Sequence, residues 1–199
     1  GKHDAGNTTY TTSITGNTNV YVKFVEKTWS VAFAASTGGT VTTPSSTPQA
    51  VGEVQGITII AETKEGYTFA GWTSSKGGRF DDAKAEKTTF YPTEATTVTA
   101  NFQEIKHTVQ VSVAAGQDTW GSVSTTSISV GQHTTSDDIT ATAQISLGYI
   151  FDHWELSDGV TIKTGSETDA TISITATKDG SLTAHFRGEN RPQEVFLIG

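Results

Sequence analysis

A seven-residue motif occurs twice in this chain, and its recurrence constrains the fold more than any other feature. Residues 66–72 read Gly-Tyr-Thr-Phe-Ala-Gly-Trp, and residues 148–154 read Gly-Tyr-Ile-Phe-Asp-His-Trp. The two tyrosines, Tyr67 and Tyr149, lie 82 positions apart (149 − 67). A fixed period of this kind indicates that each copy belongs to one folding unit. We therefore predict two similar units in tandem and expect any function to reside in the repeated unit.

Short strands separated by turn residues fill each predicted unit. Residues 29–33 and 109–113 alternate large apolar side chains with small or polar ones, the pattern of a strand with one buried face. About six such segments in about 80 residues predict a mainly β fold of tandem, small antiparallel sheets. The alternative is a β-grasp-like repeat with one short helix each, because residues 81–86 could form a helical turn in the first unit.

The repeat also suggests how the chain is divided. Residues 1–26 are predicted to hold the closing hairpin of a truncated preceding repeat, because Val-Tyr-Val-Lys-Phe at 20–24 matches the end of both units. Two β-repeats are predicted at 27–104 and 105–187, and 188–199 would be a linker and the first strand of a following module. The chain contains no Met, so we interpret Gly1 as a processed or engineered start.

Composition argues against several classes of function. The formal net charge is −8 and the 13 Lys and Arg residues are scattered, so we do not expect a nucleic-acid partner. No apolar run approaches the roughly 20 residues needed to span a bilayer, so we expect no membrane insertion by this segment. The absence of Cys excludes disulfides, thiol nucleophiles and cysteine metal sites. We expect a monomer.

Several motifs occur in the same order as in a known family. A Gly-Gly-Thr-Val turn at 38–41 is followed by an Ile-Thr-Ile strand, the Gly-Tyr-x-Phe-x-x-Trp motif and a closing Thr-Val-Thr-Ala-Asn-Phe. This set resembles the divergent internalin B-type repeats found in tandem on bacterial surface proteins. The second unit departs from it, with Trp120 before Gly121 where Gly38 precedes Gly39, and with His153 in place of Gly71.

The resemblance implies small β-rich units that act as spacers or ligand-binding modules on large extracellular proteins. It transfers no catalytic residue. It also identifies the residues that we expect to define the structural motif in the two copies, which are Gly66, Tyr67, Phe69, Trp72 and Phe102, and Gly148, Tyr149, Phe151, Trp154 and Phe186.

Three tryptophans are candidate ligand-binding residues. Trp72 and Trp154 would offer a stacking platform for sugar rings if they lay on an open sheet face, but the scarcity of large apolar residues favours a place in the core. Strand alternation by itself would put Trp72 on the face opposite Phe69. A bulge at Gly71 would bring Trp72 to the same face as Phe69. Trp120 lies in a loop that is longer than its counterpart, so it could be an exposed recognition residue or a plug over the end of the sheet.

Residues 152–155, Asp-His-Trp-Glu, have the residue types of a metal or acid–base site. Strand alternation would place Asp152 on one face and His153 with Glu155 on the other, which favours a solvated strand face. The chain lacks Gly-x-Ser-x-Gly, His-Glu-x-x-His and a phosphate-binding loop, so we expect no catalysis, no metal and no cofactor.

Three functions remain open. The first is a non-enzymatic extracellular spacer or adhesion module of a bacterial surface protein, secreted or anchored, with a host or cell-surface protein as a possible partner. The second is a glycan-binding module, whose partner would be a polysaccharide; residues 195–199 are similar to the opening strand of immunoglobulin-like modules in outer-membrane starch-binding proteins. The third is a domain appended to a polysaccharide hydrolase, with the chemistry elsewhere.

Overall fold

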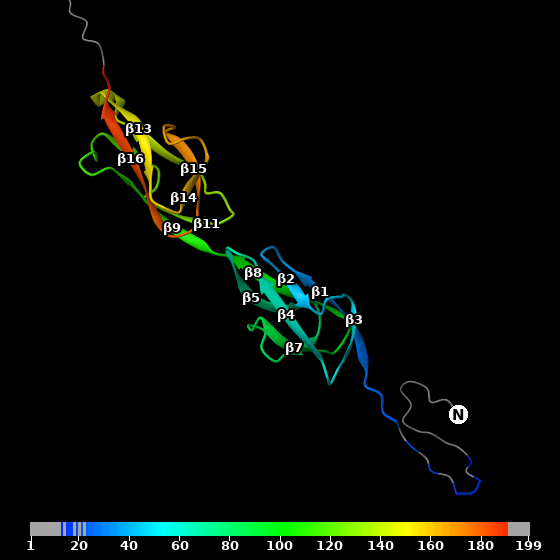
Figure 1. Cartoon of the computed structure of the whole chain (residues 1–199). Helices are drawn as coiled ribbons and strands as arrows, with labels where there is room; N and C mark the ends of the chain where they lie inside the picture. The colour runs from blue at the N-terminus through cyan, green and yellow to red at the C-terminus, as the bar shows by residue number, and fades with distance from the viewer. Residues whose placement is uncertain (1–12, 14, 18, 20, 22, 191–199) are drawn as a thin grey trace, which may run out of the picture.

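The structure is a computed structural model that describes residues 13, 15–17, 19, 21 and 23–190. Figure 1 shows two β units lying end to end. The first contains β1 (Thr28–Ala35), β2 (Gly39–Thr43), β3 (Gln49–Gly52), β4 (Ile57–Thr63), β5 (Tyr67–Ser74), β6 (Gly78–Phe80), β7 (Lys87–Pro92) and β8 (Thr96–Glu104). The second contains β9 (Lys106–Val113), β10 (Gly121–Val123), β11 (Ser127–Gly131), β12 (Ile139–Ala143), η1 (Ile145–Leu147), β13 (Tyr149–Leu156), β14 (Val160–Thr164), β15 (Thr171–Ala176) and β16 (Gly180–Gly188).

The two units, which we call repeat 1 and repeat 2, have the same strand topology. In repeat 1 the sheets have the strand orders β3-β1-β8-β5 and β2-β4-β7-β6. In repeat 2 the orders are β11-β9-β16-β13 and β10-β12-β15-β14. Each strand of repeat 1 therefore has its counterpart eight strands later, from β1 and β9 to β8 and β16. The match explains the sequence period, because every strand occupies the same place in both sheets.

The first and last strands of each repeat lie side by side in the same sheet. β1 pairs with β8 in parallel, and β9 pairs with β16 in parallel, whereas the other pairings are antiparallel. The closing strand is thus held at the centre of its sheet, with β5 or β13 on its other side. Because these two strands run in the same direction, the chain enters each repeat at one end and leaves it at the other.

Each repeat has its own hydrophobic core. Val31, Ile59, Phe90 and Val98 are fully buried in repeat 1 and belong to one cluster. Ile139, Ile172, Ile174 and Leu182 are fully buried in a separate cluster in repeat 2. Side chains from both sheets contribute to each cluster, so each repeat is a small two-layered sandwich.

A β-bulge explains how the aromatic residues of the motif reach one core. The register of β5 against β8 shifts between Phe69 and Gly71, and Gly71 has a φ of 121°. The extra residue turns Trp72 to the face of Phe69, and the two rings meet edge to face with centroids 5.6 Å apart. Of the two placements that the sequence left open for Trp72, the structure has the one that requires a bulge at Gly71. Repeat 2 has the same shift between Phe151 and His153, without glycine.

Glycines in the Gly-Gly-Thr-Val turn make room for the closing aromatic residue. A Cβ added to Gly39 would collide with the ring of Phe102, and one added to Gly121 would collide with the ring of Phe186. Gly39 and Gly121 are both buried. Only a residue without a side chain allows this close approach.

The prediction of a mainly β fold in tandem repeats is confirmed, with eight strands in each repeat rather than about six. Within the described residues η1 is the one helical element, so the β-grasp alternative with a helix in each repeat is wrong. Residues 81–86 form turns and bends, because their backbone instead pairs with neighbouring strands. The hairpin predicted within 1–26 lies largely outside the described residues, and the strand predicted at 194–199 lies entirely outside them.

The chain crosses from repeat 1 to repeat 2 in almost continuous strand conformation. β8 ends at Glu104 and β9 begins at Lys106, so Ile105 alone separates them. Figure 1 shows β8 leading directly into β9 along the long axis of the molecule. An extended backbone at this point sets the repeats end to end instead of folding them against one another.

Candidate functional site

Trp72 and Trp154 belong to the cores of their repeats. Their exposed fractions are 4% and 1%. Each indole Nε1–H donates a 3.0 Å hydrogen bond to a backbone carbonyl, that of Ala85 for Trp72 and that of Asp169 for Trp154. The side chains anchor the long loops that cover the bulges. A stacking platform on an open sheet face is therefore not formed by either residue, because the bulge turns both indoles inward.

Trp120 is half-buried at the far end of repeat 2. Its ring stacks on Tyr149 with centroids 4.7 Å apart and planes inclined by 11°. It also packs against the repeat 2 core. The backbone N–H of Gln144 donates a 2.7 Å hydrogen bond to the carbonyl of Trp120, which ties the loop to the segment before η1. Trp120 thus covers the end of the sheet while one part of its surface stays open to solvent.

The other motif residues are placed as structural elements. Phe186 is 2% exposed and Phe69, Phe102 and Phe151 pack against the cores. Gly66 and Gly148 have φ values of 81° and 82° and end the turns that lead into β5 and β13. We call Glu65–Tyr67 the tip of repeat 1 and Gly148–Tyr149 the tip of repeat 2.

A set of hydrogen bonds to one carboxylate lies where the repeats meet. Glu104, the last residue of β8, accepts hydrogen bonds at Oε1 from the backbone N–H groups of His133 (2.5 Å) and Thr134 (2.9 Å). Its Oε2 accepts a 2.5 Å bond from the Thr134 hydroxyl. A Cβ on Gly131 would collide with this carboxylate. We call this arrangement the Glu104 clasp, because the carboxylate of one repeat binds the turn after β11 of the next.

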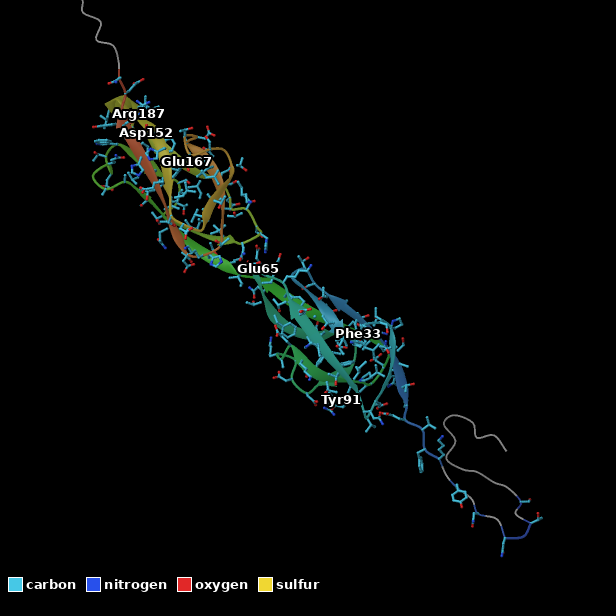
Figure 2. All side chains as sticks on the ribbon, in the orientation of Figure 1. Phe33, Glu65, Tyr91, Asp152, Glu167 and Arg187 are labelled. Carbon is cyan, nitrogen blue, oxygen red and sulfur yellow. The ribbon has the colours of Figure 1, made fainter. Side chains whose placement is uncertain are left out.

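A second contact joins the tip of repeat 1 to the same turn. The ring of His133 stacks on Tyr67, with centroids 5.3 Å apart and planes inclined by 12°. His133 Nε2 lies 3.0 Å from the carbonyl oxygen of Glu65, which accepts a hydrogen bond in the tautomer that is protonated there. Figure 2 places Glu65 at the meeting point of the two repeats. Gly66 is buried there, and a Cβ on it would meet His133 Nε2 at 2.5 Å.

The clasp alters the acidity of Glu104. Burial by itself raises the pKa of this carboxyl, but the Thr134 hydroxyl, the N–H groups of His133 and Thr134 and the charge of His133 together outweigh it. The pKa of Glu104 therefore lies below its ordinary value. The ionised carboxylate is the form that fits the joint.

A partly exposed cluster of titratable side chains lies on repeat 2. Asp152 accepts a 2.9 Å hydrogen bond from His153 Nδ1. It also forms an ion pair with Arg187, whose Nε lies 2.9 Å from Asp152 Oδ1. The His153 and His185 rings stack with centroids 4.5 Å apart, and His185 pairs with Glu155 at 3.0 Å. Figure 2 shows Asp152 and Arg187 near the far end of the molecule.

The predicted separation of Asp152 from His153 is wrong, because the bulge interrupts alternation and brings the two side chains together. The hydrogen bond from His153, and then Arg187, hold the pKa of Asp152 below its usual value against the opposing effect of burial. Among the described residues, no group of three or more His, Asp or Glu has an arrangement that could hold a metal ion. Over the same part of the chain, no helix is both long and apolar enough to cross a membrane.

Comparison with known families agrees with the repeated fold. Residues 29–106 and residues 109–190 each match the divergent InlB B-repeat domain. The chain belongs to the divergent InlB B-repeat family. No curated protein and no solved structure matches the chain at the significance required. The two matches cover nearly the whole of both sandwiches, so the internal similarity reflects two copies of the B-repeat domain.

Sequence reasoning missed the joint between the two B-repeats. A signal for it was present, because Phe24-x-Glu26 recurs as Phe102-x-Glu104, and Val51-Gly52 recurs as Val130-Gly131. In both places a glutamate lies two residues after the closing phenylalanine. Its role as the acceptor of the joint is recognisable only once the turn that it binds is known.

Proposed function

We propose that these B-repeats form a non-enzymatic spacer segment of a bacterial surface protein, presented outside the cell. The observation that carries this proposal is the joint. β8 continues into β9 with a single residue between them, and the Glu104 clasp and the Tyr67–His133 stack hold the next repeat in one orientation. A joint of this kind fixes the distance and the angle between consecutive repeats, and a spacer needs both.

The remaining surface supports a structural role over a chemical one. The carboxylate–histidine pairs of repeat 2 are partly exposed. Gly71 and Asn101 stand in repeat 1 where repeat 2 has His153 and His185, so these pairs are not a shared feature of the repeat. What the two repeats share is their core aromatics, their turn glycines and their strand order.

A display experiment tests the spacer proposal. The chain would be placed between a cell-surface anchor and an epitope, and the accessibility of the epitope to an antibody would be compared with that of a chain lacking residues 27–104. We expect accessibility to depend on the number of repeats and to be unaffected by Trp120→Ala. Accessibility that is independent of repeat number would contradict a spacer role.

A second candidate function, glycan binding, is supported by the far end of repeat 2. There the half-buried Trp120–Tyr149 stack lies next to η1, whose Ile145 and Leu147 are 62% and 65% exposed. Aromatic rings beside exposed aliphatic groups are suited to the apolar faces of sugars. A bacterial or host polysaccharide would then be the ligand.

This candidate is tested by binding to a panel of polysaccharides, followed by tryptophan fluorescence and calorimetry. We expect saturable binding of one polymer that Trp120→Ala abolishes and that Trp29→Ala leaves intact, since Trp29 lies in β1 of repeat 1. Unchanged Trp120 emission with every polymer would remove the glycan-binding function.

A further inference from the structure

The Glu104 clasp has a second copy at the N-terminal end of repeat 1. Glu26 Oε1 accepts hydrogen bonds from the backbone N–H groups of Val54 (2.5 Å) and Gln55 (2.7 Å). A Cβ on Gly52 would collide with the Glu26 carboxylate, as one on Gly131 would with Glu104. Strand register confirms the equivalence, because Gly52 pairs with Thr28 of β1 and Gly131 pairs with Lys106 of β9.

The same alignment identifies the residue that faces the preceding repeat. Val54 occupies the position of His133, the residue on which the tip of repeat 1 rests. Val54 is 77% exposed and Val25 is 82% exposed. The two line a hollow of ≈ 360 Å³ together with Glu26, Lys27 and Gln55. An apolar side chain is thus left open at the place where the other joint has a ring stacked on a ring.

We propose that this surface, which we call the Val54 socket, binds the Gly-Tyr tip of a preceding B-repeat in the geometry of the Tyr67–His133 joint. The occupant is defined by the clasp. Glu26 lies two residues after Phe24, as Glu104 lies two residues after Phe102. The turn that binds Glu26 is the counterpart of the turn that binds Glu104, so the segment before Glu26 ends as a B-repeat ends. The tyrosine ring of that repeat packs on the Val54 isopropyl group and removes it from water.

The far end of repeat 2 is not built to continue the array in this way. Gly188 pairs with Tyr149 as Glu104 pairs with Tyr67, so glycine stands where the clasp needs a carboxylate. The backbone N–H of Glu189 donates to the carbonyl of Gly148, as that of Ile105 does to Gly66, which fixes this alignment. Trp120 already covers the Tyr149 ring, whereas Gly38 stands at that position in repeat 1. The socket therefore gives the array a direction.

Tandem duplication within the full chain tests the proposal. One chain would carry residues 27–104 twice in succession, so that a Tyr67 tip faces Val54; the matched control would carry residues 105–188 twice, so that a Tyr149 tip faces His133. Because the protein has no Cys, spin labels can be placed at Thr40→Cys in both copies, or at Ser122→Cys in both copies, which are exposed and equivalent. Pulsed electron paramagnetic resonance then measures the distance distribution across the new joint.

We expect the Thr40–Thr40 distribution to be as narrow as the Thr40–Ser122 distribution of the unmodified chain, and the Ser122–Ser122 distribution to be at least twice as broad. In the control chain, Gly188→Glu combined with Trp120→Gly in the upstream copy should narrow the Ser122–Ser122 distribution. A Thr40–Thr40 distribution as broad as the control would overturn the socket. Two equally narrow distributions would overturn the direction that we assign to it.

A point substitution tests the same idea without an added repeat. His133→Val places the side chain of the Val54 socket in the existing joint, and the proposal expects the Thr40–Ser122 distribution to remain narrow, while Glu104→Gln broadens it. If His133→Val broadens the distribution as much as Glu104→Gln does, valine cannot seat the tip and the proposal fails. This deepens the spacer proposal, but the two fail separately, because epitope accessibility does not report on the Val54 surface.

Discussion

The tryptophans of the motif show how one residue can connect core and loop. Trp72 fills the space beside Phe69 and also donates its indole N–H to the carbonyl of Ala85, so its loss leaves both a cavity and an unbound carbonyl. Trp120 has a different role, since its contacts are those of a stacked pair at the end of the sheet.

We predict that Trp72→Ala lowers the free energy of unfolding of repeat 1 by about 3–5 kcal/mol, the range for removing a large aromatic side chain from a core. Trp120→Ala should lower that of repeat 2 by roughly 1–2 kcal/mol, because a half-buried stack contributes about 0.5–1.5 kcal/mol beyond its buried area. Urea denaturation followed by circular dichroism measures both. Equal losses would show that Trp120 is as much a core residue as Trp72.

Gly39 illustrates a position where a single methyl group is too large. We predict that Gly39→Ala destabilises repeat 1 by about 1–3 kcal/mol, because the new Cβ overlaps the ring of Phe102 and forces it to move. Gly188→Ala is the control, since nothing lies within 4 Å of a Cβ there, and its effect should stay within about 0.5 kcal/mol. Thermal unfolding midpoints compare the two variants, and a neutral Gly39→Ala would contradict the close approach.

At the scale of elements, β8 and β9 and the turn after β11 form a joint whose stability depends on ionisation. The folded pKa of Glu104 lies below its unfolded value, so its contribution is fully present above the unfolded pKa of about 4.3 and is lost as the pH falls through the folded pKa. The joint should thus be held at neutral pH and released in acid.

We predict that the Thr40–Ser122 distance distribution stays narrow from pH 7 to about pH 5 and broadens below about pH 4. Glu104→Gln should be broad already at pH 7, because a neutral amide makes weaker hydrogen bonds to the N–H groups of His133 and Thr134 than a carboxylate. Thr134→Val removes the hydrogen bond from the Thr134 hydroxyl to Glu104. Its distance distribution at pH 7 should be broader than that of the parent chain and narrower than that of Glu104→Gln. A joint that remains narrow at pH 3 would show that Glu104 does not hold it.

At the scale of the whole molecule, two cores meet through a small joint. The free energy of unfolding of such a chain is close to the sum of the intrinsic stabilities of its repeats and the interaction energies between neighbouring repeats. The two clusters of buried residues do not merge across Ile105, so unfolding one repeat leaves the other's core intact.

We predict that a chain carrying Trp72→Ala unfolds in two resolved steps, with repeat 2 unfolding close to its midpoint in the parent chain. Loss of the joint should cost repeat 2 about 1–3 kcal/mol, the scale of hydrogen bonds to one charged group. Segment-resolved hydrogen exchange distinguishes the two repeats. A single cooperative step that destabilises both repeats equally would mean that they form one cooperative unit.

The sequence by itself determined the repeat and the β class, and it marked Gly71 as the place where a bulge could form. Each of these rests on local chemistry: a recurring aromatic motif, alternation of apolar residues, and a glycine at the point where alternation must break. The positions of Phe69 and Phe151 against the two cores follow from the same pattern.

Only the tertiary structure decided on which face of the sheet the Asp152 and His153 side chains lie, and how the two repeats are joined. Asp152 and His153 share a face because the bulge persists in repeat 2 where a histidine replaces glycine, which alternation alone cannot anticipate. Glu104 meets Thr134 across 30 residues of chain, and Tyr67 meets His133 across the boundary between two cores. Such contacts depend on the angle at which one strand leaves a sandwich and enters the next, so no local pattern specifies them.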